Sequence, residues 1–310
     1  MSVFTVVGDM KYGQMVLQAS ILRFEKKSKL ILSRLERNMI PPTSLTIMVD
    51  KIEIVDRAEI TYDLDGEPGL DPDTPAVPQL GVGANGADGN SPAGEGNYPQ
   101  AENGGDGDHG KSGPKGTNAM HAPELEIFAR DVSQIHPDAL TINFKGQDGA
   151  KGGKGGNGGK GGDGQKGAAS QTSDSWYDGD QCDREPGRGG IGGRGGDAGY
   201  PGRGGDGGNG GIVKVFVGSS SLPLVQTWNY IVKGGRGGDA GDPGKRGEGG
   251  IGGAQGKQND PCPSRDEYRG SDGPPGLSMD EADPKWQTNF KGKDGYDGEA
   301  DQYELTGVPS

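Results

Sequence analysis

The sequence predicts an all-β fold: a β-solenoid or stacked β-strand repeat from which polyglycine II arms project and pack side by side. Three observations predict this class. Glycine accounts for 64 of the 310 residues and recurs at every third position over long stretches. Short segments with alternating apolar residues lie between these stretches. Only 29% of the residues are apolar, which is too few for the single large core of a globular enzyme of this length.

The predicted strands form pairs that recur along the chain. In each pair the two segments lie 15 residues apart, and the pair recurs at offsets of 80 and 88 residues. The copies are 45–62, 125–142 and 213–230, and the same step continues back through 30–32 and 15–17. Alternation such as Leu45, Ile47 and Val49 is typical of a half-buried strand. The internal repeat therefore predicts a stack of strand pairs.

Composition divides the chain into six segments. They are a basic strand repeat (1–66), short glycine-rich arms (67–123), a strand pair (124–146), long glycine-rich arms with a tip loop at 168–186 (147–211), a second strand pair (212–234), and further arms with an acidic C-terminal segment (235–310).

The glycine-rich arms have the three-residue period of a polyproline II-type helix. Most triplets contain two small residues, so each arm has a bare face for packing and one edge of charged side chains. Residues such as Lys151, Arg194 and Asp239 lie on these edges. The charged edges suit ion pairs with another chain or a ligand. The alternative interpretation is a solvated outer edge, because surface ion pairs are individually weak.

The two cysteines are predicted to form a disulfide. Cys182 and Cys262 are 80 residues apart, like the strand copies, and both fall in loops at the far ends of arms. A disulfide implies an oxidising location; two unpaired thiols are the alternative. The loops 168–186 and 257–269 also contain the candidate ligand-binding residues Trp176, Tyr177, Asp178 and Tyr268. Such residues suit contact with a glycan or a protein, or alternatively a small local core.

Charge predicts how copies of the chain would meet. The net charge of −13 argues against a nucleic-acid partner. Residues 1–44 are basic and residues 271–310 are acidic. We therefore expect head-to-tail self-assembly between the two ends. The residues predicted to carry it are Lys26, Lys27 and Lys29 at one end and Asp280, Glu281 and Asp283 at the other.

Other sites are weakly supported by the sequence. Residues 105–112 match a phosphate-binding loop, but they follow a glycine arm instead of a strand. Residues 158–163 and 234–239 match part of a calcium-binding nonapeptide but lack its period of nine. His109, His121 and His136 lack metal-ligand spacing. We expect no catalytic residue, no metal site and no cofactor, with calcium on the acidic loops kept as an alternative.

The glycine triplets resemble those of collagen-like bacterial proteins. The arms with end loops also resemble the glycine-rich tip adhesins of T-even-type phage tail fibres, in which polyglycine II helices carry variable loops. That resemblance implies receptor contact through the loops. No apolar run is long enough for membrane insertion, and no Sec signal peptide is visible.

These observations predict a non-enzymatic structural protein that acts extracellularly or on the surface of a virion or appendage. The first hypothesis is a self-assembling subunit of a filament or particle appendage. The second is a phage tail-fibre or cell-surface adhesin that binds a receptor or glycan through its arm-tip loops. The third is a polysaccharide lyase or hydrolase built on a β-helix.

Overall fold

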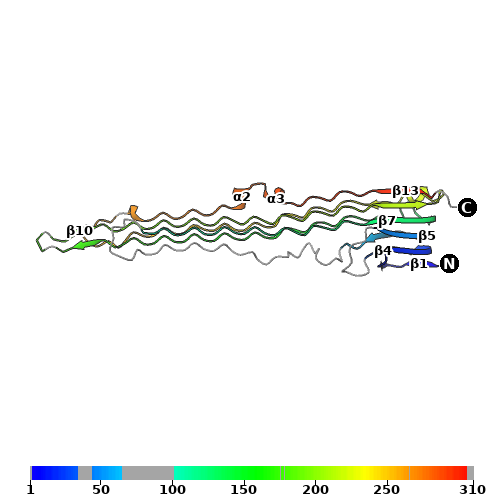
Figure 1. The fold of residues 1–310 in the computed structure, drawn as a ribbon. Coiled ribbons are helices and arrows are strands. Elements are labelled where there is room, and N and C mark those ends of the chain that lie inside the picture. The colour runs from blue at the N-terminus through cyan, green and yellow to red at the C-terminus, as the bar shows by residue number, and fades with distance from the viewer. Residues whose placement is uncertain are drawn as a thin grey trace.

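The computed structural model describes residues 2–33, 44–64, 101–174, 176–177, 179–264 and 266–305. This part of the chain is elongated. A head of β-sheet lies at one end, and glycine-rich extended segments run from it as a long bundle to a tip at the other end (Figure 1). The first and last described residues therefore both belong to the head.

The head contains two parallel sheets. In the six-stranded sheet the order is β1 (Val3–Val6), β3 (Val16–Phe24), β5 (Ser44–Ile54), β7 (Glu124–Gln134), β11 (Val213–Val217) and β13 (Ala300–Glu304). In the five-stranded sheet the order is β12 (Asn229–Ile231), β8 (Leu140–Asn143), β6 (Ala58–Tyr62), β4 (Ser28–Leu32) and β2 (Asp9–Tyr12). Each sheet thus adds one strand per repeat.

Paired strands are the corresponding strands of successive copies of the repeat. Leu45 of β5 lies opposite Leu125 of β7, which in turn lies opposite Val213 of β11. Strands 15 residues apart, such as β7 and β8, belong to different sheets. Their inward side chains, among them Ile127 and Ile142, are fully buried in one apolar core. The repeated alternation therefore builds this core between the sheets.

The connections between the sheets form the bundle. Its described extended segments are 101–123, 144–170, 187–212, 232–258 and 269–299. In the segments 144–170 and 187–212, two backbone N–H groups in most triplets donate hydrogen bonds to neighbouring segments. Gly152 donates to Asp239 (2.9 Å), and the next residue, Gly153, donates to Pro114 in a different segment (2.9 Å). Backbone groups thus find partners on several sides, as an extended helix without internal hydrogen bonds requires.

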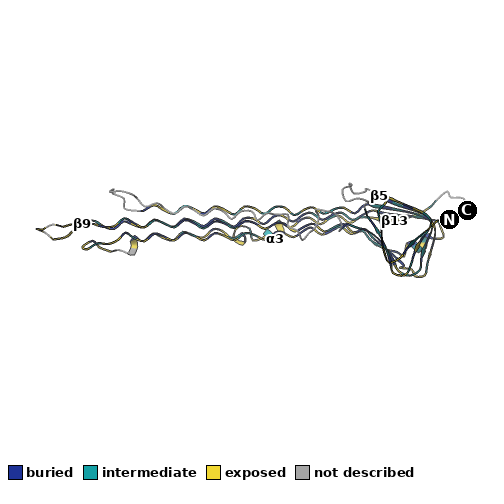
Figure 2. Ribbon diagram, turned by 90° about the horizontal axis from the view of Figure 1, so that it is seen from below, coloured by how far each residue is buried: buried dark blue, intermediate teal, exposed yellow. Residues whose placement is uncertain are grey.

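Glycine is needed in the bundle because the backbones touch. A Cβ atom on Gly202 would lie 1.8 Å from the carbonyl oxygen of Pro114 and 2.7 Å from the nitrogen of Gly153. Backbone conformation imposes little demand by comparison: among the described glycines, only Gly8 and Gly179 have a positive φ. Side chains consequently point outward, and the bundle interior is dark blue along much of its length in Figure 2.

Two short helices interrupt the last segment of the bundle. They are α2 (Met279–Ala282) and α3 (Trp286–Asn289), which lie on its flank (Figure 1). In the neighbouring segment, Ala198 donates to Leu277 (2.9 Å) and Gly204 donates to Phe290 (2.8 Å). The donor expected between them falls on Pro201, which has no N–H. Pro201, which lacks an N–H, therefore lies at the position where the helices α2 and α3 interrupt the hydrogen bonding between the two segments.

The expected all-β class is wrong. The described chain has two large parallel sheets, of six and five strands, together with short helices, an α/β-like content. Besides α2 and α3 these are α1 (Leu222–Val225), with proline in its first turn, and the 3-10 turn η1 (Asp266–Tyr268). The alternation of apolar residues predicts strands but does not say which strands pair. Parallel strands also need long crossover connections between them. The glycine-rich segments supply most of those crossovers.

Candidate functional site: the tip of the bundle

A small hairpin forms the far end of the molecule. Strands β9 (Gln171–Ser173) and β10 (Gln181–Arg184) are antiparallel, with Gln181 opposite Ser173 (Figures 1 and 2). The hydroxyl of Ser173 donates to a carboxylate oxygen of Asp183 at 2.7 Å. Gly179 has a φ of 76°, which glycine adopts without steric cost and which helps the chain to turn. The hairpin is thus built mainly from main-chain and polar contacts.

The predicted disulfide is confirmed. Cys182 of β10 is bonded to Cys262, with an S–S distance of 1.99 Å and Cα atoms 4.8 Å apart. Cys262 is almost completely buried. Its own loop is tied to the loop 168–186, because the N–H of Asn259 donates to the hydroxyl of Ser170 at 2.7 Å. The two tip loops, 168–186 and 257–269, are therefore held together by a covalent bond and by hydrogen bonds.

Two aromatic side chains of the hairpin face solvent. Trp176 is 93% exposed and Tyr177 is 80% exposed. Their rings meet edge to face, with centroids 5.2 Å apart. Asp178, the neighbouring candidate residue, lies outside the described residues. The pair forms an apolar surface at the end of the bundle, which we call the tip aromatic pair.

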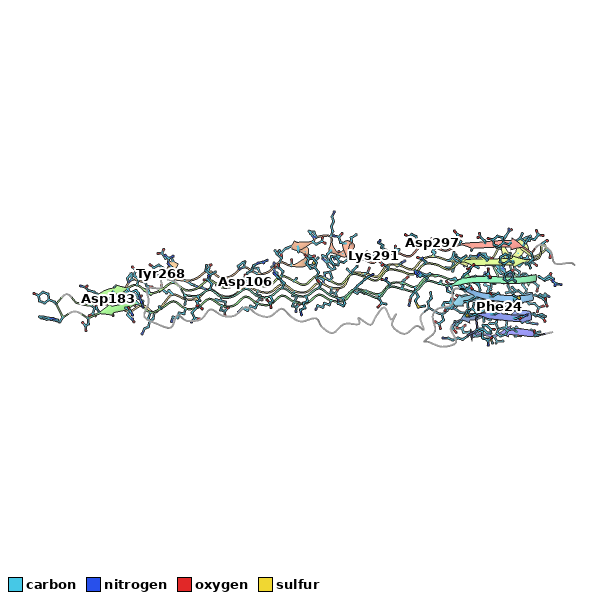
Figure 3. The ribbon with its side chains drawn as sticks, in the orientation of Figure 1. Phe24, Asp106, Asp183, Tyr268, Lys291 and Asp297 are labelled. Carbon is cyan, nitrogen blue, oxygen red and sulfur yellow. A yellow bond between two sulfur atoms is a disulfide. The ribbon has the colours of Figure 1, made fainter. Side chains whose placement is uncertain are left out.

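Tyr268 has a structural role in the tip. Its side chain is buried, and its hydroxyl donates to a carboxylate oxygen of Glu185 at 2.6 Å. The guanidinium of Arg188 lies 5.0 Å from the centre of its ring. Figure 3 places Tyr268 at the tip end of the bundle near Asp183. This residue belongs to the local core that was the alternative interpretation of the loops.

Carboxyl groups accompany the tip aromatic pair. A hydrogen bond with the Asp174 carboxyl, together with its charge, raises the pKa of Asp180. The tip therefore offers aromatic faces beside a pair of neighbouring carboxyl groups.

The basic residues predicted for self-assembly lie in the head. Lys26 and Lys27 occupy the turn between β3 and β4, where Lys27 has a φ of 53°. Lys29 is in β4, and its ammonium is 3.3 Å from a carboxylate oxygen of Glu59.

The acidic residues predicted to meet them lie beside the bundle, where they stabilise the α2–α3 segment. Glu281 contacts Arg246 through both oxygens at 3.0 Å and also caps α2 at Ser278. Asp280 accepts a hydrogen bond from the indole of Trp286 at 2.8 Å, and Asp283 accepts from the amide of Asn289. Head-to-tail assembly through these six residues stays a prediction.

The charged edges of the arms make contacts within the chain. Lys151 is 3.1 Å from Asp242 and Lys115 is 3.3 Å from Asp206, each pair joining neighbouring segments. We did not predict a second contact, in which a polar side chain accepts a hydrogen bond from the backbone of a neighbouring segment. Asn157, for example, accepts from the N–H of Lys245 at 2.9 Å.

Two histidines take part in the same pattern. The Nδ1 atoms of His109 and His121 accept from the N–H groups of Asp197 (3.0 Å) and Asn209 (2.7 Å). Asn157 and both histidines bond 88 residues ahead. The spacing of Asp, Asn and His relative to the repeat was the sequence signal that could have revealed this.

Within the described ranges, no cluster of three or more His, Cys, Asp or Glu side chains has the geometry to hold a metal ion. No helix in that part of the chain combines the length and apolar character needed to cross a membrane. Compared with known protein families and with curated proteins, the sequence matches no family and no protein. The chemistry of the tip must therefore be judged from its own residues.

Proposed function

We propose that this protein is a non-enzymatic structural protein for attachment, which holds a contact surface at a distance from its base. The observation that carries the proposal is the tip aromatic pair, Trp176 and Tyr177, exposed at the end of the bundle. Their hairpin is fastened by the Cys182–Cys262 disulfide, so binding loses less conformational freedom than in a free loop. Large aromatic side chains on such a loop are typical of binding hot spots.

The bundle acts as the spacer in this proposal. Its backbone hydrogen bonds run from the head to the tip, and its charged side chains pair with one another across segments. The partner would be a protein or glycan on another surface. The disulfide favours an oxidising setting, either extracellular or on a virion or appendage.

The test is a double variant, Trp176→Ala with Tyr177→Ala. Labelled protein would be applied to panels of cells and to a glycan array. We expect wild-type binding to fall about tenfold or more, because each aromatic anchor carries a large share of such contacts. The matched control is Ile251→Ala, which removes an exposed apolar side chain from the flank of the bundle. Unchanged binding by the double variant would refute the attachment function.

A second candidate is the self-assembling filament or appendage subunit. It is favoured by the edge strands at the two ends of the head, β1 and β2 at one end and β12 and β13 at the other, beyond which the described part of the chain places no further strand. Contacts between unlike ends propagate into fibres when the rotation does not close. Negative-stain electron microscopy should then show regular fibres, and replacing Lys26, Lys27 and Lys29 with glutamate should abolish them. Discrete particles at all concentrations would contradict this candidate.

A further inference from the structure

The two ends of the strand stack in the head have different chemistry. At the β13 end, two of the three positions that align with buried valines of β11 are polar; the third is Ala300, opposite Val213. Gln302 lies opposite Val215, and Glu304 lies opposite Val217. Glu304 also accepts a hydrogen bond from Ser219, and helix α1 contacts the strand. Inward polar residues on an edge strand are a known means of preventing further strands from adding.

At the β1 and β2 end, the apolar interior continues to the last strands. Phe4 and Met10 pack against the core, and Val6 is completely buried. The ring of Phe4 contacts that of Tyr12 edge to face, with centroids 5.5 Å apart. Val3 and Val7 are 54% and 62% exposed beside them. Among the described residues of β1 and β2, no charged side chain points into the core.

The backbone at this end also has groups directed outward. The carbonyls of Ser2 and Val6 accept hydrogen bonds from β3 and the residue after it, and those of Gly8 and Tyr12 accept from β4 and the residue after it. Because main-chain groups alternate in direction along a parallel strand, the intervening residues point away from the sheet. These residues are Val3, Thr5, Asp9 and Lys11. Among the described residues, no strand lies beyond β1 or β2.

We propose that this edge binds the same edge of a second copy of the chain, so that β1 and β2 pair antiparallel with their counterparts about a two-fold axis. Both sheets then continue from one subunit into the other. The two bundles extend in opposite directions, and each copy presents its own tip. This surface is separate from the tip, so its test does not depend on the attachment function.

The charge pattern of β2 selects this partner and its register. In an antiparallel pair of β2 strands, the residues with outward main-chain groups, Asp9 and Lys11, must lie opposite such residues of the other copy. Three registers meet this condition and bring charged side chains of the two copies together. Centring on Asp9 places two aspartates together, and centring on Lys11 places two lysines together. Centring on Met10 places Asp9 opposite Lys11 of the other copy, twice. Lys11 also contacts Asp63 at 2.8 Å, but its side chain is 68% exposed and available at the edge.

The same edge is poorly suited to the β13 end of another copy. Head-to-tail pairing would continue the row of Phe4 and Val6 into Gln302 and Glu304. That arrangement places a carboxylate against the apolar interior, which is unfavourable unless the charge is paired. Two-fold pairing instead joins apolar rows to each other.

The test is a charge exchange at β2, measured by sedimentation equilibrium over a concentration series. We expect the wild-type protein to reach twice the mass of one chain. Asp9→Lys alone, or Lys11→Asp alone, places like charges opposite each other and should raise the dissociation constant about tenfold or more. An equimolar mixture of the two variants restores both opposite-charge pairs, and we expect dimers to return.

Controls separate this surface from its alternatives. Asp301→Lys changes an outward charge on β13 and should leave the dimer unaffected; loss of association in that variant would indicate head-to-tail contact and overturn the proposal. A wild-type protein that stays monomeric, or an equimolar mixture that stays monomeric while each variant keeps its wild-type melting temperature, would overturn it as well. Thr5→Pro removes one outward N–H without removing a bond to β3, and we expect it to weaken the dimer.

Discussion

The head and the bundle both pair their backbone groups by hydrogen bonds, but only the head fills its interior with side chains. In the head, strands hydrogen bond side by side, and apolar side chains such as Ile127 and Ile142 fill the space between the sheets. In the bundle, the interior contains almost no side chains, and backbones approach each other directly. Figure 3 shows this contrast: Phe24 lies within the sheets, whereas side chains such as Asp106 lie on the bundle's extended segments.

Each region is stabilised by a different kind of contact. The head is stabilised by apolar area, so removing side-chain atoms weakens it. The bundle is stabilised by hydrogen bonds on several sides of each segment, which must offset the large conformational entropy that glycine loses on ordering. Adding even one carbon atom to its interior should therefore be more harmful than removing several from the head.

The largest effect is expected from Gly202→Ala. Its new Cβ would overlap the carbonyl of Pro114 and crowd Gly153, and neither contact is with a movable side chain. We expect a loss of more than about 4 kcal/mol in unfolding free energy, measured by chemical denaturation. The control Asp239→Ala changes an exposed side chain of the bundle and should stay within about 0.5 kcal/mol of the wild type. Similar curves for both variants would mean that the backbones do not touch in solution.

The next effect tests the head. Ile127 is fully buried, and Ile127→Ala should cost about 3 kcal/mol through lost apolar contact and a residual cavity. Ile127→Val should cost about 1 kcal/mol. A graded loss in the head, beside the abrupt loss in the bundle, would support the comparison. Equal tolerance of Ile127→Ala and Ile127→Val would contradict it.

Acid should weaken the bundle progressively. Hydrogen bonds from the backbone N–H of Ile251 and from Lys160 lower the pKa of Asp163. The N–H of Lys293 and, to a lesser extent, Lys115 lower the pKa of Asp206. A folded-state pKa below the unfolded value stabilises the fold at neutral pH, and this stability is lost as pH falls below about 4. Melting temperature should decline over that range, and less steeply in Asp206→Asn. A flat profile would argue against these contacts.

The smallest effect concerns a single side-chain acceptor. Asn157→Ala leaves the N–H of Lys245 to water and should cost about 0.5–1 kcal/mol, since the site is exposed. Asn157→Asp keeps an acceptor at the same place and should recover most of the loss. Thermal melts of the two variants side by side measure the difference. If the aspartate variant were as unstable as the alanine variant, the hydrogen bond would not be the cause.

Much of the tip could be predicted from the sequence because spacing constrained it. Cys182 and Cys262 share the 80-residue offset of the strand copies, and the structure joins them. The exposure of Trp176 and Tyr177 and the burial of Tyr268 could not be separated, because all three are aromatic residues in polar loops. Burial depends on neighbours such as Glu185 and Arg188, which reach Tyr268 only after the loops have folded.

The local periods of this protein follow directly from its amino-acid sequence. Alternating apolar residues specified strands such as β5, β7 and β11, and glycine at every third position specified extended segments that carry no side chains on their contacting faces. Both are local properties of the chain. Long-range packing selected which strands are neighbours, which acidic side chains stabilise the α2–α3 segment and which end of the head remains apolar. These outcomes rest on contacts between residues as far as 94 positions apart, and no local period specifies such contacts.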